Sequence, residues 1–203
     1  SSAASDVYKR QVLAHDRGAR VAHRLALDHP AAVQRMVLLD IAPTLSMYAQ
    51  TDEAFARAYW HWFFLIRPAP LPEALIESNP ELYLRSVMGS RSAGLKPFTD
   101  EAFAEYLRCL QLPGTARGIC EDYRAAAGID LEHDQADIDA GNHLNLPLLV
   151  MWGAEGTVGR CFEPLKEWQK VATDVRGKAL PAGHYIAEEA PELLLGEVLA
   201  FLR

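Results

Sequence analysis

In two segments of the sequence, short apolar runs alternate with helical patterns. Between these segments lies a stretch without strand signals, and this arrangement constrains the fold most. The flanking segments are residues 12–42 and 143–203, and the helix-rich stretch between them is residues 43–142. Short continuous apolar runs are typical of parallel strands covered on both faces, and strands that alternate with helices build a parallel sheet. The sequence therefore predicts an α/β fold with a helical cap inserted at residues 43–142.

The residues that come directly after the expected strands are the first to inspect, because function gathers at the carboxyl ends of parallel strands. We expect strands over residues 12–14, 36–40, 146–153 and 177–180. We expect helices over residues 17–29, 51–65, 73–77, 80–88, 99–110, 115–127, 162–171 and 191–202, with N-caps at Thr51, Thr99 and Thr115. Four titratable residues then come after strands: Asp16, Asp40, Glu155 and His184.

Asp16 stands at a predicted turn from a strand into a helix, in AHDRG, between the small residues Ala14 and Gly18. Such tight turns expose a nucleophile above the sheet. A carboxylate attacks an sp3 carbon well and leaves an ester that water can hydrolyse, so Asp16 suits alkyl displacement and not amide cleavage. The amide of Arg17, in the first turn of the helix, would stabilise the oxyanion of ester hydrolysis.

His184 lies in PAGHY, on the loop after the last expected strand, where a general base would deliver water to that ester. Asp40 or Glu155 would orient its ring. The chain order nucleophile, acid, histidine agrees with that of the α/β-hydrolases. The other histidines lack metal-ligand spacing, and no metal or organic cofactor is implied.

At HDRGAR, His15 to Arg20, the sequence resembles the fluoroacetate dehalogenases, a branch of the α/β-hydrolases close to the epoxide hydrolases. The resemblance covers nearly everything after residue 13. It implies an α/β-hydrolase fold in which Arg17 and Arg20 hold the substrate carboxylate. Two guanidinium groups also fit a small anionic substrate on charge grounds. The family's acid comes after the next strand, which matches Asp40 in LLDIAP, with Glu155 as the alternative.

The expected cap carries two further resembling segments. YWHWFF, Tyr59 to Phe64, is similar to the family segment that binds the departing halide, and CEDYRAAA resembles the segment that adds a tyrosine to it. The implied halide-binding residues are His61, Trp62 and Tyr123. Fluoride is strongly hydrated, so N–H and O–H donors must replace water as it departs. Three other cap tyrosines compete for the role of Tyr123: Tyr59, Tyr83 and Tyr106.

The implied reaction is hydrolysis of a small haloacid, fluoroacetate, to glycolate and fluoride. Asp16 would attack the α-carbon, and His184, held by Asp40, would activate water against the resulting ester. An epoxide hydrolase is the nearest alternative, although Arg17 stands where the resemblance to that branch leads us to expect Trp. A noncatalytic anion-binding protein of the same fold is the alternative from another class.

Charge and composition limit the partners. The formal net charge is −7, and the basic residues form no run that would bind phosphates, so no nucleic-acid partner is expected. No apolar run reaches the length of a membrane span and no signal peptide is recognised, so we expect a cytoplasmic protein with reduced cysteines. The resemblance implies a homodimer.

Residues 1–11 differ in character from the rest of the chain, because Lys9, Arg10 and Gln11 stand where a buried strand should be apolar. We interpret residues 1–11 as a non-native or scar segment. The strands that open an α/β-hydrolase sheet, and the loop with the second oxyanion-hole amide, then have no counterpart before Val12. If this chain were all that exists, we would expect it to expose an apolar sheet edge, aggregate and be inactive.

Overall fold

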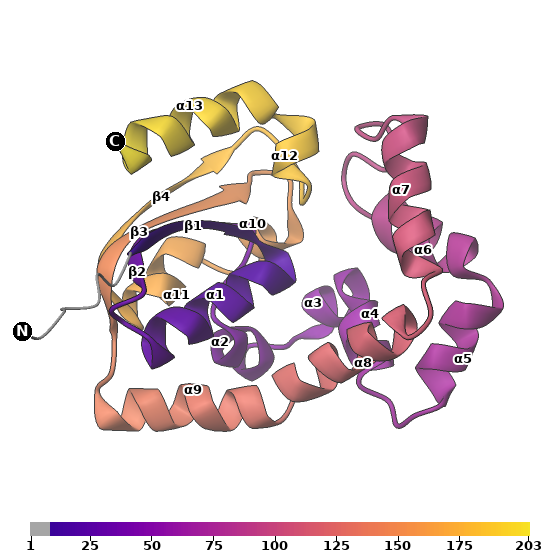
Figure 1. Ribbon diagram of the computed structural model, residues 1–203, viewed down its shortest axis with the longest axis horizontal. Coiled ribbons are helices and arrows are strands. Elements are labelled where there is room, and N and C mark those ends of the chain that lie inside the picture. The colour runs from indigo at the N-terminus through magenta and orange to yellow at the C-terminus, as the bar shows by residue number, and fades with distance from the viewer. Residues whose placement is uncertain (1–8) are drawn as a thin grey trace, which may run out of the picture.

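A four-stranded parallel sheet forms the centre of the computed structural model, which describes residues 9–203. The strands pair in the order β1-β2-β3-β4 (Figure 1). Their bounds are β1 Arg10–His15, β2 Val33–Leu39, β3 Leu144–Gly153 and β4 Ala172–Leu180. Because all strands are parallel, their carboxyl ends meet at one edge, as the sequence predicted.

Helices cover both faces of the sheet. α1 Asp16–Asp28 joins β1 to β2, while α10 Thr157–Cys161 and α11 Pro164–Gln169 join β3 to β4. α12 Ile186–Glu189 and α13 Pro191–Leu202 end the chain, and α13 lies on the face opposite α1 and α11 (Figure 1). Alternate strand residues face opposite sides, so Met36 and Leu38 pack towards α1 and α11, whereas Val37 and Leu39 pack towards α13.

The chain between β2 and β3 is helical. Its helices are α2 Thr44–Ala49, α3 Glu53–Ala58, α4 Trp60–Leu65, α5 Leu71–Ser78, α6 Pro80–Gly89, α7 Asp100–Leu110, α8 Thr115–Ala126 and α9 Ile129–Ala140. Helices α4 to α8 stand beside the carboxyl edge of the sheet, and α9 returns beneath α1 towards β3 (Figure 1). None of the helices in the described part of the chain is long and apolar enough to cross a membrane.

The expected helix over residues 51–65 is wrong, because it is two helices. Tyr59 breaks it with φ −114° and ψ 39°, and Asp52, not Thr51, caps α3 by accepting a hydrogen bond from the Phe55 amide at 2.8 Å. Thr99 caps α7 as predicted, accepting from the Ala102 amide. The N-cap of α8 is instead Gly114, whose φ of +83° favours glycine.

Several element bounds also differ from the expected ones. Helix α9 was missed because none of its residues is buried, so its sequence carries no apolar periodicity. Strand β4 begins at Ala172 rather than residue 177, since as a sheet edge it tolerates polar residues. Strand β1 begins at Arg10, whose amide donates to the Ala32 carbonyl, and Gln11 donates to the Leu202 carbonyl. Of the proposed scar segment, residues 1–8 lie outside the described residues.

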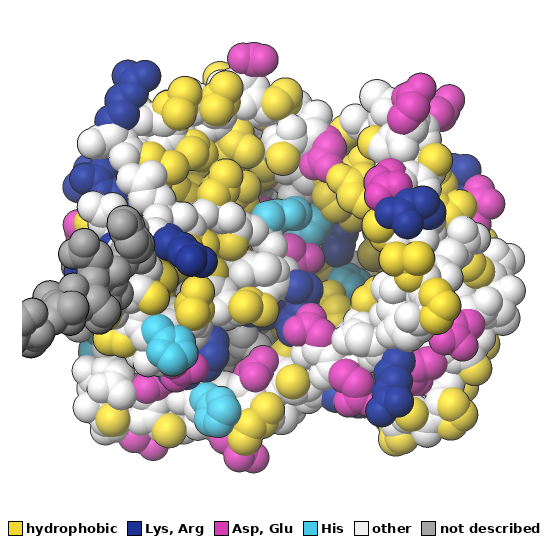
Figure 2. Space-filling model, viewed as in Figure 1, with side chains coloured by type: hydrophobic (Ala, Val, Ile, Leu, Met, Phe, Trp, Pro, Cys, Tyr) yellow, Lys and Arg dark blue, Asp and Glu magenta, His cyan; other side chains and the backbone are white. Residues whose placement is uncertain are grey.

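Strand β1 is an edge of the described sheet, and Leu13 on it is 50 % exposed. Hydrophobic side chains also gather over α13 and the adjoining sheet (Figure 2). Unpaired strand edges with apolar side chains template association. We therefore expect the purified chain to self-associate and Leu13→Lys to reduce the association, as measured by light scattering. Leu82→Lys, at a 61 % exposed leucine on α6, is the control, and an equal effect of both would contradict a role of the edge.

Candidate active site

Two aspartates meet at the carboxyl edge of the sheet with unusual backbone conformations. Asp16 begins α1 directly after β1, and Asp40 comes directly after β2. Their φ angles are 46° and 47°, in the left-handed region. Aspartate tolerates this region better than most residues, and such strain persists where the surroundings hold it, often at functional sites.

His184, on the loop after β4, lies between the two carboxylates. Its Nδ1 is 2.6 Å from Asp40 Oδ2, and its Nε2 is 3.4 Å from Asp16 Oδ2. Asp40 Oδ1 also accepts a hydrogen bond from the Gly153 amide at 3.0 Å. Asp40 is fully buried and His184 is 4 % exposed, whereas 29 % of the Asp16 side chain is exposed. Asp16 is therefore the member of the three that a ligand can reach.

Glu155, the alternative partner for His184, does not contact it. Its side chain is exposed, and its backbone amide donates to the Ala182 carbonyl at 3.1 Å. The acid that the structure brings to the histidine is Asp40.

The pKa values of Asp16 and His184 shift in opposite directions. Burial acts to raise the pKa of Asp16, but the hydrogen bond and charge of His184 outweigh it and hold that pKa below its usual range. Burial acts to lower the pKa of His184, but hydrogen bonds and charges from Asp16 and Asp40 raise it to about 9. Both shifts favour an ionised carboxylate beside an imidazolium.

His15 supports the histidine loop from behind. Its Nε2 is 2.9 Å from the His184 carbonyl oxygen, to which it donates in the matching tautomer. Burial and the neighbouring His184 lower the pKa of His15, so the ring stays neutral. His15 thus helps to position the backbone of His184.

Gly153, the last residue of β3, lies so close to the loop that carries His184 that only glycine fits there. A Cβ at Gly153 would lie 2.0 Å from the Gly183 carbonyl oxygen. Gly18, by contrast, has open space where its Cβ would be. No contact with the described residues therefore requires a glycine at position 18, because that side of α1 is exposed.

We expect Gly153→Ala to displace the loop that carries His184, lowering the free energy of unfolding by about 1–3 kcal/mol and reducing activity. Urea unfolding measures the first effect. Gly118→Ala, in α8, is the matched control, since a Cβ there meets nothing within 4 Å and alanine favours a helix. Equal destabilisation by both variants would contradict the close approach.

Arg17 and Arg20 lie one helical turn apart on α1 and are already partly engaged. Arg17 Nη2 donates to the Asp122 carbonyl at 2.9 Å and its Nε pairs with the Asp122 carboxylate. Arg20 Nη1 donates to Thr44 Oγ1 at 2.6 Å. Arg17 Nη1 and Arg20 Nε are buried without a hydrogen-bond partner among the described residues. Each guanidinium therefore keeps N–H capacity for a ligand.

The three predicted cap residues lie next to these arginines. Arg17 Cζ is 4.6 Å from the centre of the Tyr123 ring, and Arg20 Cζ is 4.5 Å from that of Trp62. The rings of His61 and Trp62, on α4, lie 6.0 and 6.1 Å from that of Tyr123, on α8. Burial, followed by the charge of Asp16, raises the pKa of Tyr123, so its hydroxyl remains a donor.

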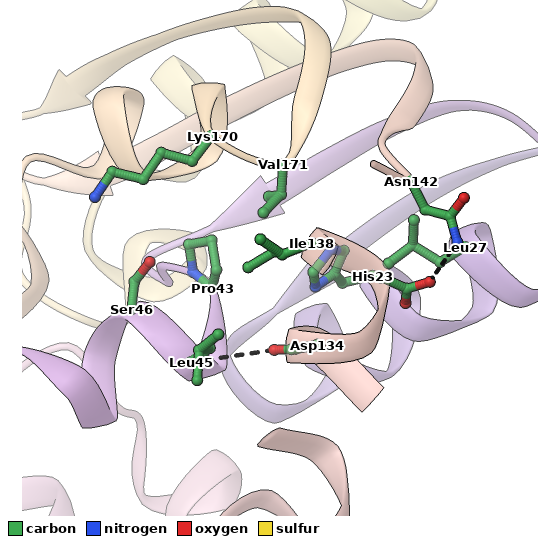
Figure 3. A pocket seen from close by; sticks show the side chains of 11 residues that line it. His23, Leu27, Pro43, Leu45, Ser46, Asp134, Ile138, Asn142, Lys170 and Val171 are labelled. Atoms are coloured by element: carbon green, nitrogen blue, oxygen red, sulfur yellow. Dashed lines mark hydrogen bonds between the residues drawn. The ribbon is translucent and has the colours of Figure 1, made fainter. Parts of the chain in front are cut away.

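Figure 2 shows a hollow between the sheet and the cap helices, in which histidine, acidic and basic side chains gather. A separate apolar cavity lies between α1, α2 and α9 (Figure 3). Its lining includes His23, Pro43 and Ile138 but none of Asp16, Asp40 and His184. It is therefore distinct from the candidate site.

The structure adds residues that sequence reasoning missed. Tyr185 comes directly after His184, and its ring lies 4.9 Å from the imidazole; its place in PAGHY could have indicated it. Tyr59 was named only as a competitor of Tyr123, yet its ring lies 6.5 Å from His184. Asp122 adjoins Tyr123 in the resembling segment. Arg91, between α6 and α7, carries no signal in the sequence.

Comparisons with known proteins place this arrangement in a superfamily, although no family model matches the chain. The chain is 38 % identical, over 89 % of its length, to a fluoroacetate dehalogenase from Burkholderia sp. It is 31 % identical, over 94 % of its length, to a soluble epoxide hydrolase from Corynebacterium sp. (strain C12). The chain spans 59 % and 65 % of the lengths of these two relatives.

A solved structure from Nostoc sp PCC 7120, described as a candidate alpha/beta hydrolase, superimposes with a TM-score of 0.92. The two chains are 50 % identical, and the match covers 97 % of this chain and 67 % of the other. The parallel sheet with covering helices agrees with the fold predicted from the sequence. The chain therefore belongs to the α/β-hydrolases.

Proposed function

We propose that this protein is a hydrolase that removes halide from a small haloacid, with fluoroacetate as substrate, through an ester on Asp16. The observation that carries the proposal is the pair of Asp16 and His184. One partly exposed carboxylate lies 3.4 Å from a buried imidazole that a second carboxylate orients. That pair supplies a nucleophile and a base. The identity with the Burkholderia fluoroacetate dehalogenase supports the choice of substrate.

In the first step the free N–H groups of Arg17 and Arg20 bind the substrate carboxylate. An Asp16 carboxylate oxygen then forms a bond to the α-carbon while the carbon–halogen bond breaks, and the halide takes the electron pair. His61, Trp62 and Tyr123 offer N–H and O–H donors to the departing halide. Because Asp16 has a lowered pKa, it stays ionised at neutral and mildly acidic pH.

In the second step His184 must lose its proton to act as a base. Its pKa of about 9 depends on the negative charge of Asp16. Esterification neutralises Asp16, so the pKa of His184 falls and the ring can accept a proton from water. That water attacks the ester carbonyl, and glycolate leaves. The Arg17 amide in the first turn of α1 remains our expected donor to the oxyanion.

A single turnover in heavy-oxygen water, followed by mass analysis of peptides, tests the ester. We expect one labelled oxygen in the peptide that carries Asp16, because water attacks the carbonyl carbon of that side chain. The peptide that carries Asp40 serves as a control within the same digest, since Asp40 is fully buried. An unlabelled Asp16 after halide release would refute the ester route.

An epoxide hydrolase is the second candidate, and the two cap tyrosines Tyr59 and Tyr123 favour it, because both are buried near His61 and could protonate an opening ring. The identity with the Corynebacterium epoxide hydrolase adds support. Release of fluoride from fluoroacetate and release of a diol from a matched small epoxide separate the two. Diol release without fluoride release would favour the second candidate.

A further inference from the structure

A third guanidinium, that of Arg91, lies buried beside the candidate site. Arg91 is 9 % exposed, and its Cζ lies 4.4 Å from the centre of the Tyr59 ring. Its Nη2 is 3.5 Å from His61 Nε2. Its Nε and Nη1 are buried without a hydrogen-bond partner among the described residues. These donor nitrogens of a buried cation are left for a ligand, with the Tyr185 hydroxyl as the nearby polar group, whose hydrogen bond to Arg91 acts to lower the pKa of Tyr185.

The segment that carries Arg91 is fixed against the catalytic loop. A Cβ at Gly183 would lie 2.1 Å from Ser92 Oγ, so the residue after Arg91 packs directly on the backbone that precedes His184. This close approach holds Arg91 at the cap side of the site. Arg17 and Arg20 reach the site from α1, where they contact the rings of Tyr123 and Trp62.

Burial of a cation without a paired anion costs free energy, which a bound anion would recover. Arg17 has Asp122 as its partner, but no aspartate or glutamate among the described residues forms an ion pair with Arg91. The carboxylate whose charge acts on Arg91 is that of Asp16, which His184 already holds. An anion that forms between Asp16 and the cap would therefore meet Arg91.

The neighbouring His61 cannot supply a positive charge to such an anion. Burial and the charge of Arg91 lower the pKa of His61 to about 3, so its ring is neutral at working pH. With Arg91 facing Nε2, the His61 proton is favoured on Nδ1. Arg91 is the charged donor next to His61, whereas Arg17 and Arg20 lie next to Tyr123 and Trp62.

We propose that Arg91 binds the departing halide, which makes it a further catalytic residue and suits the site to poor leaving groups such as fluoride. This inference rests on the proposed dehalogenation. As the bond from Asp16 to carbon forms, the carbon–fluorine bond breaks and its electron pair goes to fluoride. The N–H groups at Nη1 and Nε of Arg91 then donate to that fluoride, and a charge-assisted hydrogen bond is strongest to the smallest halide.

The test compares ester formation from fluoroacetate, chloroacetate and bromoacetate in single turnovers. We expect Arg91→Met to slow ester formation from fluoroacetate by about 100-fold or more, with a smaller effect for chloroacetate and the smallest for bromoacetate. Arg91→Lys should restore part of the rate with fluoroacetate. The rates with fluoroacetate and bromoacetate are compared as a ratio within one variant, so a loss of folded protein lowers both rates equally and leaves the ratio unchanged. Arg85→Met, at an exposed arginine on α6 paired with Glu81, is the control and should leave the ratio unchanged.

An equal loss in the rate of ester formation from all three haloacetates would overturn the proposal, because Arg91 would then only support the fold of the cap. A raised KM for a halogenated dicarboxylate with an unchanged halide ratio would also overturn it, since Arg91 would then bind a second carboxylate. If the unmodified protein releases no halide, the proposed function fails, and bromide binding tests Arg91 separately. Saturable quenching of tryptophan fluorescence by bromide should then weaken about tenfold in Arg91→Met, and unchanged binding would overturn the site.

Discussion

Asp16→Asn is expected to reduce halide release at least about 10⁴-fold and to lower the pKa of His184 below about 9. The first effect arises because an amide is a far weaker nucleophile than a carboxylate. The second arises because the variant loses one of the two carboxylates that hold the proton on His184. Halide release and an NMR titration of the His184 ring measure the two effects.

The same variant should change the dependence of stability on pH. The folded-state pKa of His184 is raised above its ordinary value, so the stability it contributes is present below about pH 6.5. That contribution is lost as the pH rises through about 9. The free energy of unfolding of the unmodified protein, relative to Asp16→Asn, should therefore fall between these pH values.

Asp28→Asn is the matched control, at the other end of the same helix, where Asp28 pairs with Arg24 on the surface. It should leave both halide release and the titration of His184 unchanged. A His184 pKa that stays near 9 in Asp16→Asn would show that Asp40 alone sets it. The proposed activation of the base by esterification would then fail.

The core of the site was predictable because strands and turns leave local marks. The apolar runs before Asp40 and Gly153 identified buried parallel strands; the acid follows the first of them, and the second ends on the glycine that lies close to Gly183. The turn at Asp16 was predictable from a strand that leads at once into a helix. Such features depend on neighbours in sequence, so one sequence suffices to find them.

The cap was less predictable because its contacts join residues far apart in the chain. Nothing near Asp122 or Arg17 in sequence indicates that they pair across 105 positions. Arg91 lies outside any periodic segment, and contacts between distant parts of the chain, such as that of Ser92 with Gly183, bring it to the site. At the break, the Tyr59 ring packs against its neighbours Phe55 and Trp62 and against Arg91, which is distant in the chain.

His184→Asn is expected to form the ester and then stop. Asparagine keeps a donor that can face Asp40, so the fully buried carboxylate is not left unpaired. The variant lacks a base, so ester hydrolysis should slow by about 10²–10⁴-fold. We expect one halide per chain and a gain in mass of one carboxymethyl group on the peptide that carries Asp16.

The experiment is best run well above the ordinary pKa of a carboxyl group, because the variant loses the main influence that lowers the pKa of Asp16. A double variant that adds Asp16→Asn controls for alkylation elsewhere and should gain no mass. Repeated turnover by His184→Asn would show that His184 is not the base of ester hydrolysis. If neither halide nor adduct forms, the displacement step itself needs His184. Both steps would then depend on His184, which the proposed mechanism assigns to hydrolysis alone.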